Sequence, residues 1–505
     1  MSDLTRVVTR VFILSTVVIG AGNSVSPATG VERTGTRAQE AVEDEDLSAS
    51  SAQSVKRYTN ARLEADLIAL KRSRPSYPFW QHVFMIPDGH IIFGRAEDGH
   101  LLATFPTRGN WAEEGVWADE TFTSILSGQT LPRGLRQRRE RVVELLETEA
   151  GQIIHNPTRG YFLLPNAERY GRFLAEWATI YERFGVPAEI GLAQAVLESG
   201  LNGRARSRAQ ALGLCQFLRR NWNHLNRLAP YVIEAYNQST QAPYCAAYLT
   251  ILATMYGSFI PALSEHHAGG VNVGRAVING ERLGGTGTRE QYLLGSKFAR
   301  DLRRIGLRRH RELYRTYGLR SYLYSEMVFG NTINVKKLIA EMPQAQIFAM
   351  RVPRDVSLQE VTEKTGLSVD EIKRFNPALI RRVPARAHLY LPRHESDFGP
   401  DVSFWHRPAD SSYSAVLNEF VRLDVLPGRW HTASFEPTLR GFQERFLATG
   451  TEEGTVMGTM LAYVIGDLHS SRRGAILEEF RESSRVLRLF ERGVRELSAA
   501  NDGAQ

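Results

Sequence analysis

The chain has 505 residues, more than one hydrophobic core usually serves, so several domains are expected. Hydrophobic residues make up 43% and charged residues 23%, the balance of an ordinary globular protein. The net charge of +7 is basic without being extreme, and two cysteines are too few for a disulfide framework. No Cys-x-x-Cys or His-Glu-x-x-His pattern occurs, so we expect no metal and no cofactor.

Residues 1–29 have the pattern of a secretory signal peptide. Arg6 and Arg10 precede an apolar run from Val11 to about Gly20, and small residues follow. Because this run is short for a bilayer span, we expect export to the periplasm, with an uncleaved N-terminal anchor as the alternative.

Residues 30–75 are expected to form a disordered tether and then a helix. Acidic and small residues dominate up to about Ser54, with almost no large apolar side chains. The helix is expected from about Val55 to Lys71, because the Arg74-Pro75 pair ends it.

Residues 76–160 read as an accessory region that contains a small β meander. Asp88-Gly89 and Asp98-Gly99 are tight-turn signals between short apolar runs, which predicts three strands between residues 82 and 105. A histidine follows each turn and raises the question of a metal site. A metal site needs further ligands, and none is evident in this region. The two histidines are therefore explained more simply as the first residues of two strands that follow similar turns.

The most informative stretch runs from Glu198 to Gln216. Pro187 and Gly200 mark the start and the end of a helix that carries Glu198 in its last turn. The helix dipole and partial burial both oppose a negative charge there, so they favour the protonated carboxyl. A carboxyl that is neutral near pH 7 can act as a general acid. Taken alone, however, a glutamate at this position is also typical of a solvated helix end.

The same stretch resembles the signature of the lytic transglycosylases with a soluble-transglycosylase (SLT) domain, which share a lysozyme-like fold. The resemblance is carried by Glu198-Ser199, Asn202, Ala205, Ser207, Ala209, Ala211 and Gly213-Leu214-Cys215-Gln216. It implies that Glu198 protonates the glycosidic oxygen between N-acetylmuramic acid and N-acetylglucosamine in peptidoglycan, and then acts as the base. The implied product is a 1,6-anhydromuramoyl end, an exception to the two-carboxylate scheme.

The resemblance also implies substrate-binding residues. These are Ser199, Ser207, Gln216, His267 and Tyr292. His267 stands where the family has the asparagine of Ala-Tyr-Asn-Ala-Gly, and its ring can donate a hydrogen bond much as that amide does. Tyr292 resembles the tyrosine that lines the family's cleft. Glu265 raises the alternative of a hydrolase, but residues two apart on a helix point to different sides, so we expect Glu265 to lie outside the chemical step.

The lysozyme-like catalytic domain is expected at residues 161–320 and is mostly helical by periodicity. The predicted helices are 167–184, 187–199, 213–226, 242–256 and 289–307. Arginine is dense in this domain, at Arg204, Arg206 and Arg208 among other positions, which is also the footprint of nucleic-acid binding. An exported protein rarely meets nucleic acid, so we expect no such partner.

Cys215 and Cys245 are the only cysteines. In an oxidising compartment they could form a disulfide bond that joins two helical segments. The sequence does not show whether their Cα atoms approach closely enough, so two buried thiols are the favoured interpretation.

Residues 345–394 read as strand, helix, helix and strand and resemble a LysM peptidoglycan-binding module. The resemblance is carried by Val352, Leu358, Gly366, Ser368-Val369, Ile372, Asn376-Pro377 and Leu389-Tyr390-Leu391-Pro392. The family's usual Gly-Asp-Thr is Arg354-Asp355-Val356 here, so the module has diverged. A small structural cap would show the same pattern.

Residues 395–505 are predicted to be largely helical, with amphipathic stretches and no catalytic motif. Two roles are open for this region: packing on the catalytic domain, or binding a protein of the cell envelope.

The sequence thus predicts a multidomain, mainly α protein, most similar to membrane-bound lytic murein transglycosylases of the D type. The expected activity is cleavage of peptidoglycan glycan strands by a single glutamate. Two alternatives are a catalytically weak peptidoglycan-binding scaffold and a hydrolytic muramidase.

Overall fold

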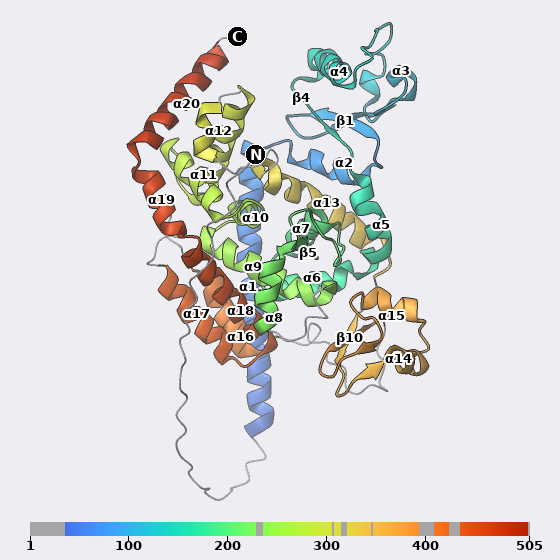
Figure 1. Ribbon diagram of the computed structural model, residues 1–505, viewed down its shortest axis with the longest axis vertical. Helices are drawn as coiled ribbons and strands as arrows, with labels where there is room; N and C mark the ends of the chain where they lie inside the picture. Colours follow the sequence, from blue (N-terminus) through green and yellow to red (C-terminus); the bar gives the residue numbers. More distant parts are fainter. Residues whose placement is uncertain are drawn as a thin grey trace, which may run out of the picture. The chain divides into compact units, whose positions relative to one another are not determined.

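The computed structural model describes residues 36–228, 236–305, 308–314, 321–344, 347–392, 409–423 and 435–502. The fold is mainly helical with a few small sheets, which confirms the predicted class (Figure 1). The predicted signal peptide lies outside the described residues. Within them, no helix combines the length and the apolar character that a bilayer span requires.

The first helix, α1 (Thr36–Ser73), is much longer than predicted. The expected disordered tether is therefore wrong from Thr36 onward. Low hydrophobicity indicated disorder, but this segment is rich in alanine, glutamate and glutamine, which favour helix over coil. The helix ends before Pro75, as predicted.

The accessory region contains a four-stranded antiparallel sheet in the order β3-β2-β1-β4. Its strands are β1 (His90–Arg95), β2 (Leu101–Pro106), β3 (Val116–Trp117) and β4 (Ile153–Pro157). The predicted three-stranded meander is wrong in two ways. First, residues 77–85 form the helices η1 (Tyr77–Phe79) and α2 (Trp80–Met85) where a strand was predicted. Second, the sheet has a further strand, β4, which follows a long segment after β2. The segment between β2 and β4 contains the helices α3 (Trp111–Glu114), η2 (Glu120–Phe122) and α4 (Leu135–Ala150).

The catalytic region is a group of packed helices that share one large apolar core. Its first elements are α5 (Gly160–Tyr170), η3 (Gly171–Phe173), α6 (Leu174–Arg183), α7 (Ala188–Ser199), α8 (Arg219–Leu228) and α9 (Gln238–Tyr256). The predicted helix at 213–226 is wrong in its first half. Strands β5 (Ala211–Leu212) and β6 (Phe217–Leu218) form a hairpin there, and Gln216 adopts a left-handed φ of 52° that a helix does not contain.

Four helices complete this region, and three of them were not predicted. They are α10 (Phe259–Ala268), α11 (Gly270–Arg282), α12 (Thr288–Arg304) and α13 (Tyr324–Glu341), with η5 (Arg308–Tyr314) and η6 (Ser321–Leu323) between the last two. Helix α13 lies beyond the predicted limit of the catalytic domain at residue 320, yet it packs against α7 and α10. Residues on α13 can therefore reach the site that α7 carries.

Residues 348–391 form the small module that the sequence predicted. Strands β7 (Phe348–Arg351) and β10 (His388–Leu391) pair antiparallel around α14 (Leu358–Thr365) and α15 (Val369–Phe375). A second short pair consists of β8 (Val356–Ser357) and β9 (Arg382–Val383). Asp355, in the diverged Arg-Asp-Val segment, accepts a hydrogen bond from the backbone N–H of Ala385 at 2.8 Å. The aspartate that this segment retains thus still organises the loop.

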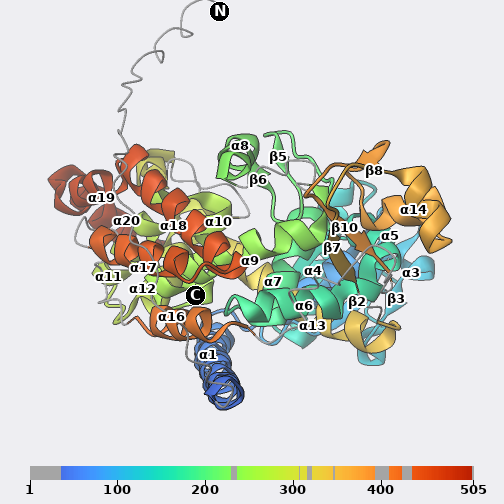
Figure 2. The same ribbon diagram turned by 90° about the horizontal axis from the view of Figure 1, so that it is seen from below.

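The C-terminal region is helical, as predicted. Its helices are α16 (Ser411–Val421), α17 (Glu436–Ala448), α18 (Glu452–Ser470), α19 (Arg473–Glu482) and α20 (Ser484–Asp502). A break at Ser483 separates α19 from α20. These helices pack on the catalytic region, with α18 against α9 and α19 against α11 (Figure 2). Of the two roles that the sequence left open for this region, the structure shows packing on the catalytic domain.

Candidate active site

Helix α7 carries Glu198 in its last turn and ends at Gly200, which adopts a left-handed φ of 59°. A Cβ atom at this glycine would come within 2.0 Å of the Phe162 carbonyl oxygen, so only glycine lets the chain pass α5 here. The α7 end is thus locked between its own cap and α5. The structure therefore gives Glu198 a fixed backbone position.

The Glu198 carboxyl group is largely withdrawn from solvent, with 13% of its side chain exposed. The Tyr324 hydroxyl of α13 donates a hydrogen bond of 2.5 Å to Glu198 Oε1. Burial raises the Glu198 pKa to about 7, and the bond from Tyr324 opposes this rise only in part. Near neutral pH the group therefore divides between its acid and its base form, which suits a residue that gives and then takes a proton.

Two adjacent histidines of α10 approach the same carboxyl oxygen. His266 Nε2 and His267 Nδ1 each lie 3.9 Å from Glu198 Oε1, too far for a hydrogen bond. His266 Nε2 donates to the Cys215 carbonyl oxygen at 2.8 Å, because a carbonyl can only accept. Burial lowers the His266 pKa to about 4, so this ring is neutral at pH 7. His266 therefore links the signature loop to α10 without adding charge.

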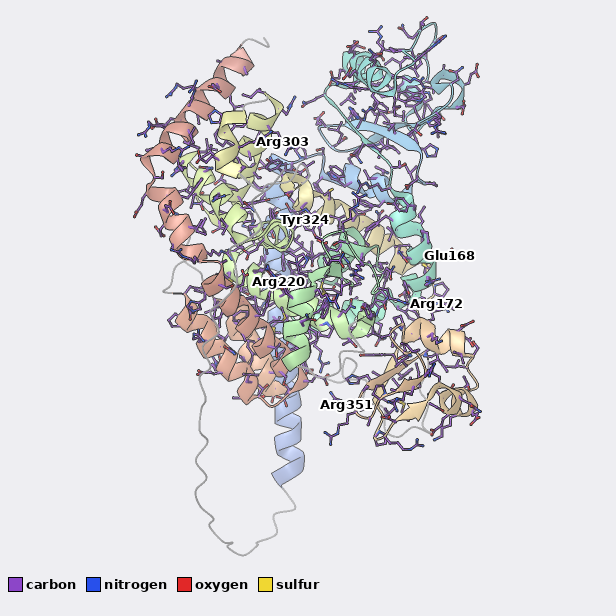
Figure 3. All side chains as sticks on the ribbon, viewed as in Figure 1. Glu168, Arg172, Arg220, Arg303, Tyr324 and Arg351 are labelled. Atoms are coloured by element: carbon purple, nitrogen blue, oxygen red, sulfur yellow. A yellow bond between two sulfur atoms is a disulfide. The ribbon has the colours of Figure 1, made fainter. Side chains whose placement is uncertain are left out.

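His267 differs from its neighbour because part of its ring faces solvent. Its side chain is 39% exposed, while one face stacks on Tyr324 with ring centroids 4.4 Å apart and planes 8° apart. Burial lowers its pKa as well. A neutral imidazole held by stacking and open on one side can contact a bound ligand. Figure 3 labels Tyr324, which lies beside α10.

Three predicted substrate-binding residues of the signature serve the shape of the loop. The Ser199 hydroxyl is buried and donates to the Leu214 carbonyl at 2.8 Å. Ser207 Oγ accepts from the Ala211 N–H at 3.0 Å. Gln216 Nε2 lies 3.0 Å from both the Ala205 and the Gly213 carbonyl oxygens. These contacts hold the loop beside Glu198.

A disulfide bond joins Cys215 to Cys245. The expectation of two buried thiols is therefore wrong. Helix α9 passes directly behind the signature loop and brings the two Cα atoms to 6.0 Å, which is within disulfide range. The sequence separation of 30 residues gave no sign of this approach. The bond fixes the residue whose carbonyl oxygen holds His266.

Tyr292 is fully buried in the helical core on α12. The tyrosine that contacts Glu198 is Tyr324 instead. Sequence reasoning missed it because α13 lies 126 residues beyond Glu198 and carries no motif of the signature. It also assigned no role to His266. The sequence signal for this role was weak: Tyr324 is the first residue of α13, a helix that was not predicted.

Glu265 makes contacts that bind both of its carboxylate oxygens. Arg473 of α19 donates from Nη1 to Oε1 and from Nη2 to Oε2, each at 2.6 Å, and the Tyr256 hydroxyl also donates to Oε2. The side chain is 4% exposed. Glu265 is thus committed to an internal ion pair, although it directly precedes the two histidines.

Within the described ranges, no group of three or more histidine, cysteine, aspartate or glutamate residues could hold a metal ion. Arg204, Arg206 and Arg208 are exposed on the loop that follows α7. The site accordingly consists of one buried carboxyl group, a tyrosine, two histidines and a loop held by a disulfide bond.

Two family models match the chain. Residues 176–284 match the transglycosylase SLT domain, which includes Glu198 and both histidines. Residues 348–397 match the LysM-like domain of the lytic transglycosylase MltD. A search of curated proteins gives no match. The chain thus combines an SLT transglycosylase domain with an MltD-type LysM-like domain, which supports a peptidoglycan lytic transglycosylase similar to MltD.

Proposed function

We propose that Glu198 alone supplies the acid and the base for cleavage of the bond between N-acetylmuramic acid and N-acetylglucosamine. The observation that carries the proposal is the burial of this carboxyl at the end of a helix inside the SLT match, and this burial raises its pKa to about 7. A group with this pKa holds a proton for the glycosidic oxygen near neutral pH and can accept another afterwards.

The proton cycle follows from the surroundings of Glu198. The protonated carboxyl gives its proton to the leaving oxygen as the glycosidic bond breaks. The resulting carboxylate is stabilised by the Tyr324 hydroxyl, whose bond to Oε1 strengthens when the acceptor is charged. The carboxylate then removes the proton from the muramoyl 6-hydroxyl, which closes the 1,6-anhydro ring. No water is consumed.

The contacts of Glu265 favour a lyase over a hydrolase. A hydrolase of the two-carboxylate type needs a second carboxylate that can activate water. Glu265 is the acidic residue nearest to the histidines in sequence, and Arg473 and Tyr256 occupy its oxygens. Water activation by this residue would first require that a buried ion pair be broken.

His267 is proposed to position the substrate. Its ring stacks on Tyr324 and its exposed part offers a ring nitrogen to a sugar substituent such as an acetamido group. The LysM-like domain is proposed to hold glycan strands, and the site of action is proposed to be the periplasm. Both proposals rest on the domain matches and on the N-terminal sequence pattern.

The test compares Glu198→Gln with the wild-type protein on purified sacculi. We expect the variant to fold and to lose at least about a hundredfold in turnover, because glutamine is isosteric but cannot exchange the proton. Glu189→Gln is the matched control. Glu189 lies at the other end of α7 and pairs with Lys336 at 3.3 Å. The Glu189→Gln variant should therefore keep wild-type turnover. Retention of more than about a hundredth of wild-type turnover by Glu198→Gln would overturn the assignment.

A further inference from the structure

Helix α10, which carries both histidines of the site, is held at its first turn by a residue outside the SLT match. Asp66 of α1 is fully buried. Its Oδ2 accepts from the Phe259 N–H at 2.7 Å, and its Oδ1 accepts from the Ser258 hydroxyl at 2.7 Å. Arg289 of α12 completes the ion pair. A carboxylate on the first N–H groups of a helix fixes where that helix begins.

The last turn of α10 is held by a second segment outside the match, the C-terminal helix α19. Arg473 forms the two 2.6 Å bonds to Glu265 already described, and its side chain is 2% exposed. Its guanidinium group lies so close to Gly270 that a Cβ atom there would come within 2.3 Å of it. Arg473 therefore passes under the junction of α10 and α11, and a larger residue at position 270 would have to displace its guanidinium group.

His266 and His267 directly follow Glu265, within the turn that Arg473 holds. The position of that turn decides where the two rings lie relative to Glu198 Oε1, at 3.9 Å each. Because a two-pronged Arg–carboxylate pair fixes direction as well as distance, it restrains rotation of the turn. The restraint acts on the site through the backbone of this turn, because Arg473 binds Glu265 and the two histidines directly follow Glu265.

We propose that Arg473 is a positioning residue of the active site, and that the C-terminal helices serve catalysis by fixing the turn of α10 that bears His266 and His267. The proposal rests on the assignment of Glu198 as the catalytic residue. It gives the region after residue 408 a role in turnover that needs no partner protein. Asp66 performs the matching task at the opposite end of the helix.

Arg473→Met tests this on a soluble glycan strand substrate, with kcat and KM measured separately. We expect kcat to fall at least about tenfold with KM changed little, because a small misplacement of catalytic groups affects the reaction step most. The matched control is Arg183→Met. Arg183 of α6 pairs with Glu453 of α18 at 2.6 Å, with 9% and 7% of the side chains exposed, so it joins the same two regions away from α10. The Arg183→Met variant should have a lower Tm but a kcat within about twofold of the wild-type value.

A second variant keeps the test decisive if Arg473→Met folds poorly. Glu265→Gln/Arg473→Met removes both buried charges, so we expect Tm to recover towards the wild-type value. If Arg473 positions the histidines, kcat stays low in this double variant. The kcat of Arg473→Lys should lie between those of wild type and Arg473→Met, because lysine cannot make the two-pronged contact. Recovery of kcat together with Tm, or an equal loss of kcat in Arg183→Met, would overturn the proposal.

Wild-type protein and Glu198→Gln are measured in the same assay. If the wild type releases no product, the proposed function fails. If the wild type is active, Glu198→Gln is inactive and Arg473→Met has full kcat, only the positioning role fails.

Discussion

Replacement of Glu198 by glutamine should stabilise the protein, and the gain should depend on pH. Burial raises the Glu198 pKa from 4.5 to about 7, so the folded protein holds this proton more tightly than the unfolded chain does. Between these two pH values the free energy of unfolding therefore falls as pH rises, and the penalty is complete above about pH 7. A pKa rise of this size corresponds to about 3 kcal/mol. Glutamine has no charge to bury and escapes the penalty.

The assay follows thermal unfolding of wild type and Glu198→Gln from pH 4 to pH 8. At pH 4 both side chains are neutral, so the two Tm values should agree, which serves as the internal control. At pH 8 the variant should unfold at the higher temperature by a few degrees. A Tm difference that is independent of pH, or a variant that is less stable at pH 8, would refute the claim that Glu198 is held in its protonated form by burial.

Three further predictions concern the groups around Glu198. Tyr324→Phe removes a hydrogen bond that favours the carboxylate, so the alkaline limb of kcat/KM should move up by about one pH unit; an unchanged or lower limb would contradict this. His267→Ala should reduce turnover while anhydromuramoyl ends remain the product by mass spectrometry, and a change to reducing ends would argue against a pure positioning role. Cys245→Ala opens a loop of 30 residues closed by Cys215, so denaturant unfolding should show a loss of about 3–4 kcal/mol; no loss would mean that the bond is absent.

Local sequence signals were enough to place Glu198. Pro187 and Gly200 bound α7 as predicted, because both act through their own backbone geometry. The raised pKa was also predictable in direction, since a helix end and partial burial both oppose charge. These inferences depend on residues that lie within one or two turns of each other.

The contacts that complete the site join residues far apart in sequence. Tyr324 lies 126 residues from Glu198, and Arg473 lies 208 residues from Glu265. No periodicity carries information about such pairs, because each depends on how separate helices pack. The disulfide bond was missed for the same reason. The helix predicted at 213–226 failed differently, because a turn at Gln216 interrupts a run that has helical spacing.

The chemical identity of the newly formed muramoyl end tests the central claim most directly. Mass spectrometry of muropeptides released from sacculi distinguishes a 1,6-anhydromuramoyl end from a reducing end, which is heavier by one water. We predict that the wild-type protein releases anhydromuramoyl ends and that Glu198→Gln releases none. Reducing muramic acid ends from the wild type, lost in Glu265→Gln, would contradict the single-glutamate lyase mechanism.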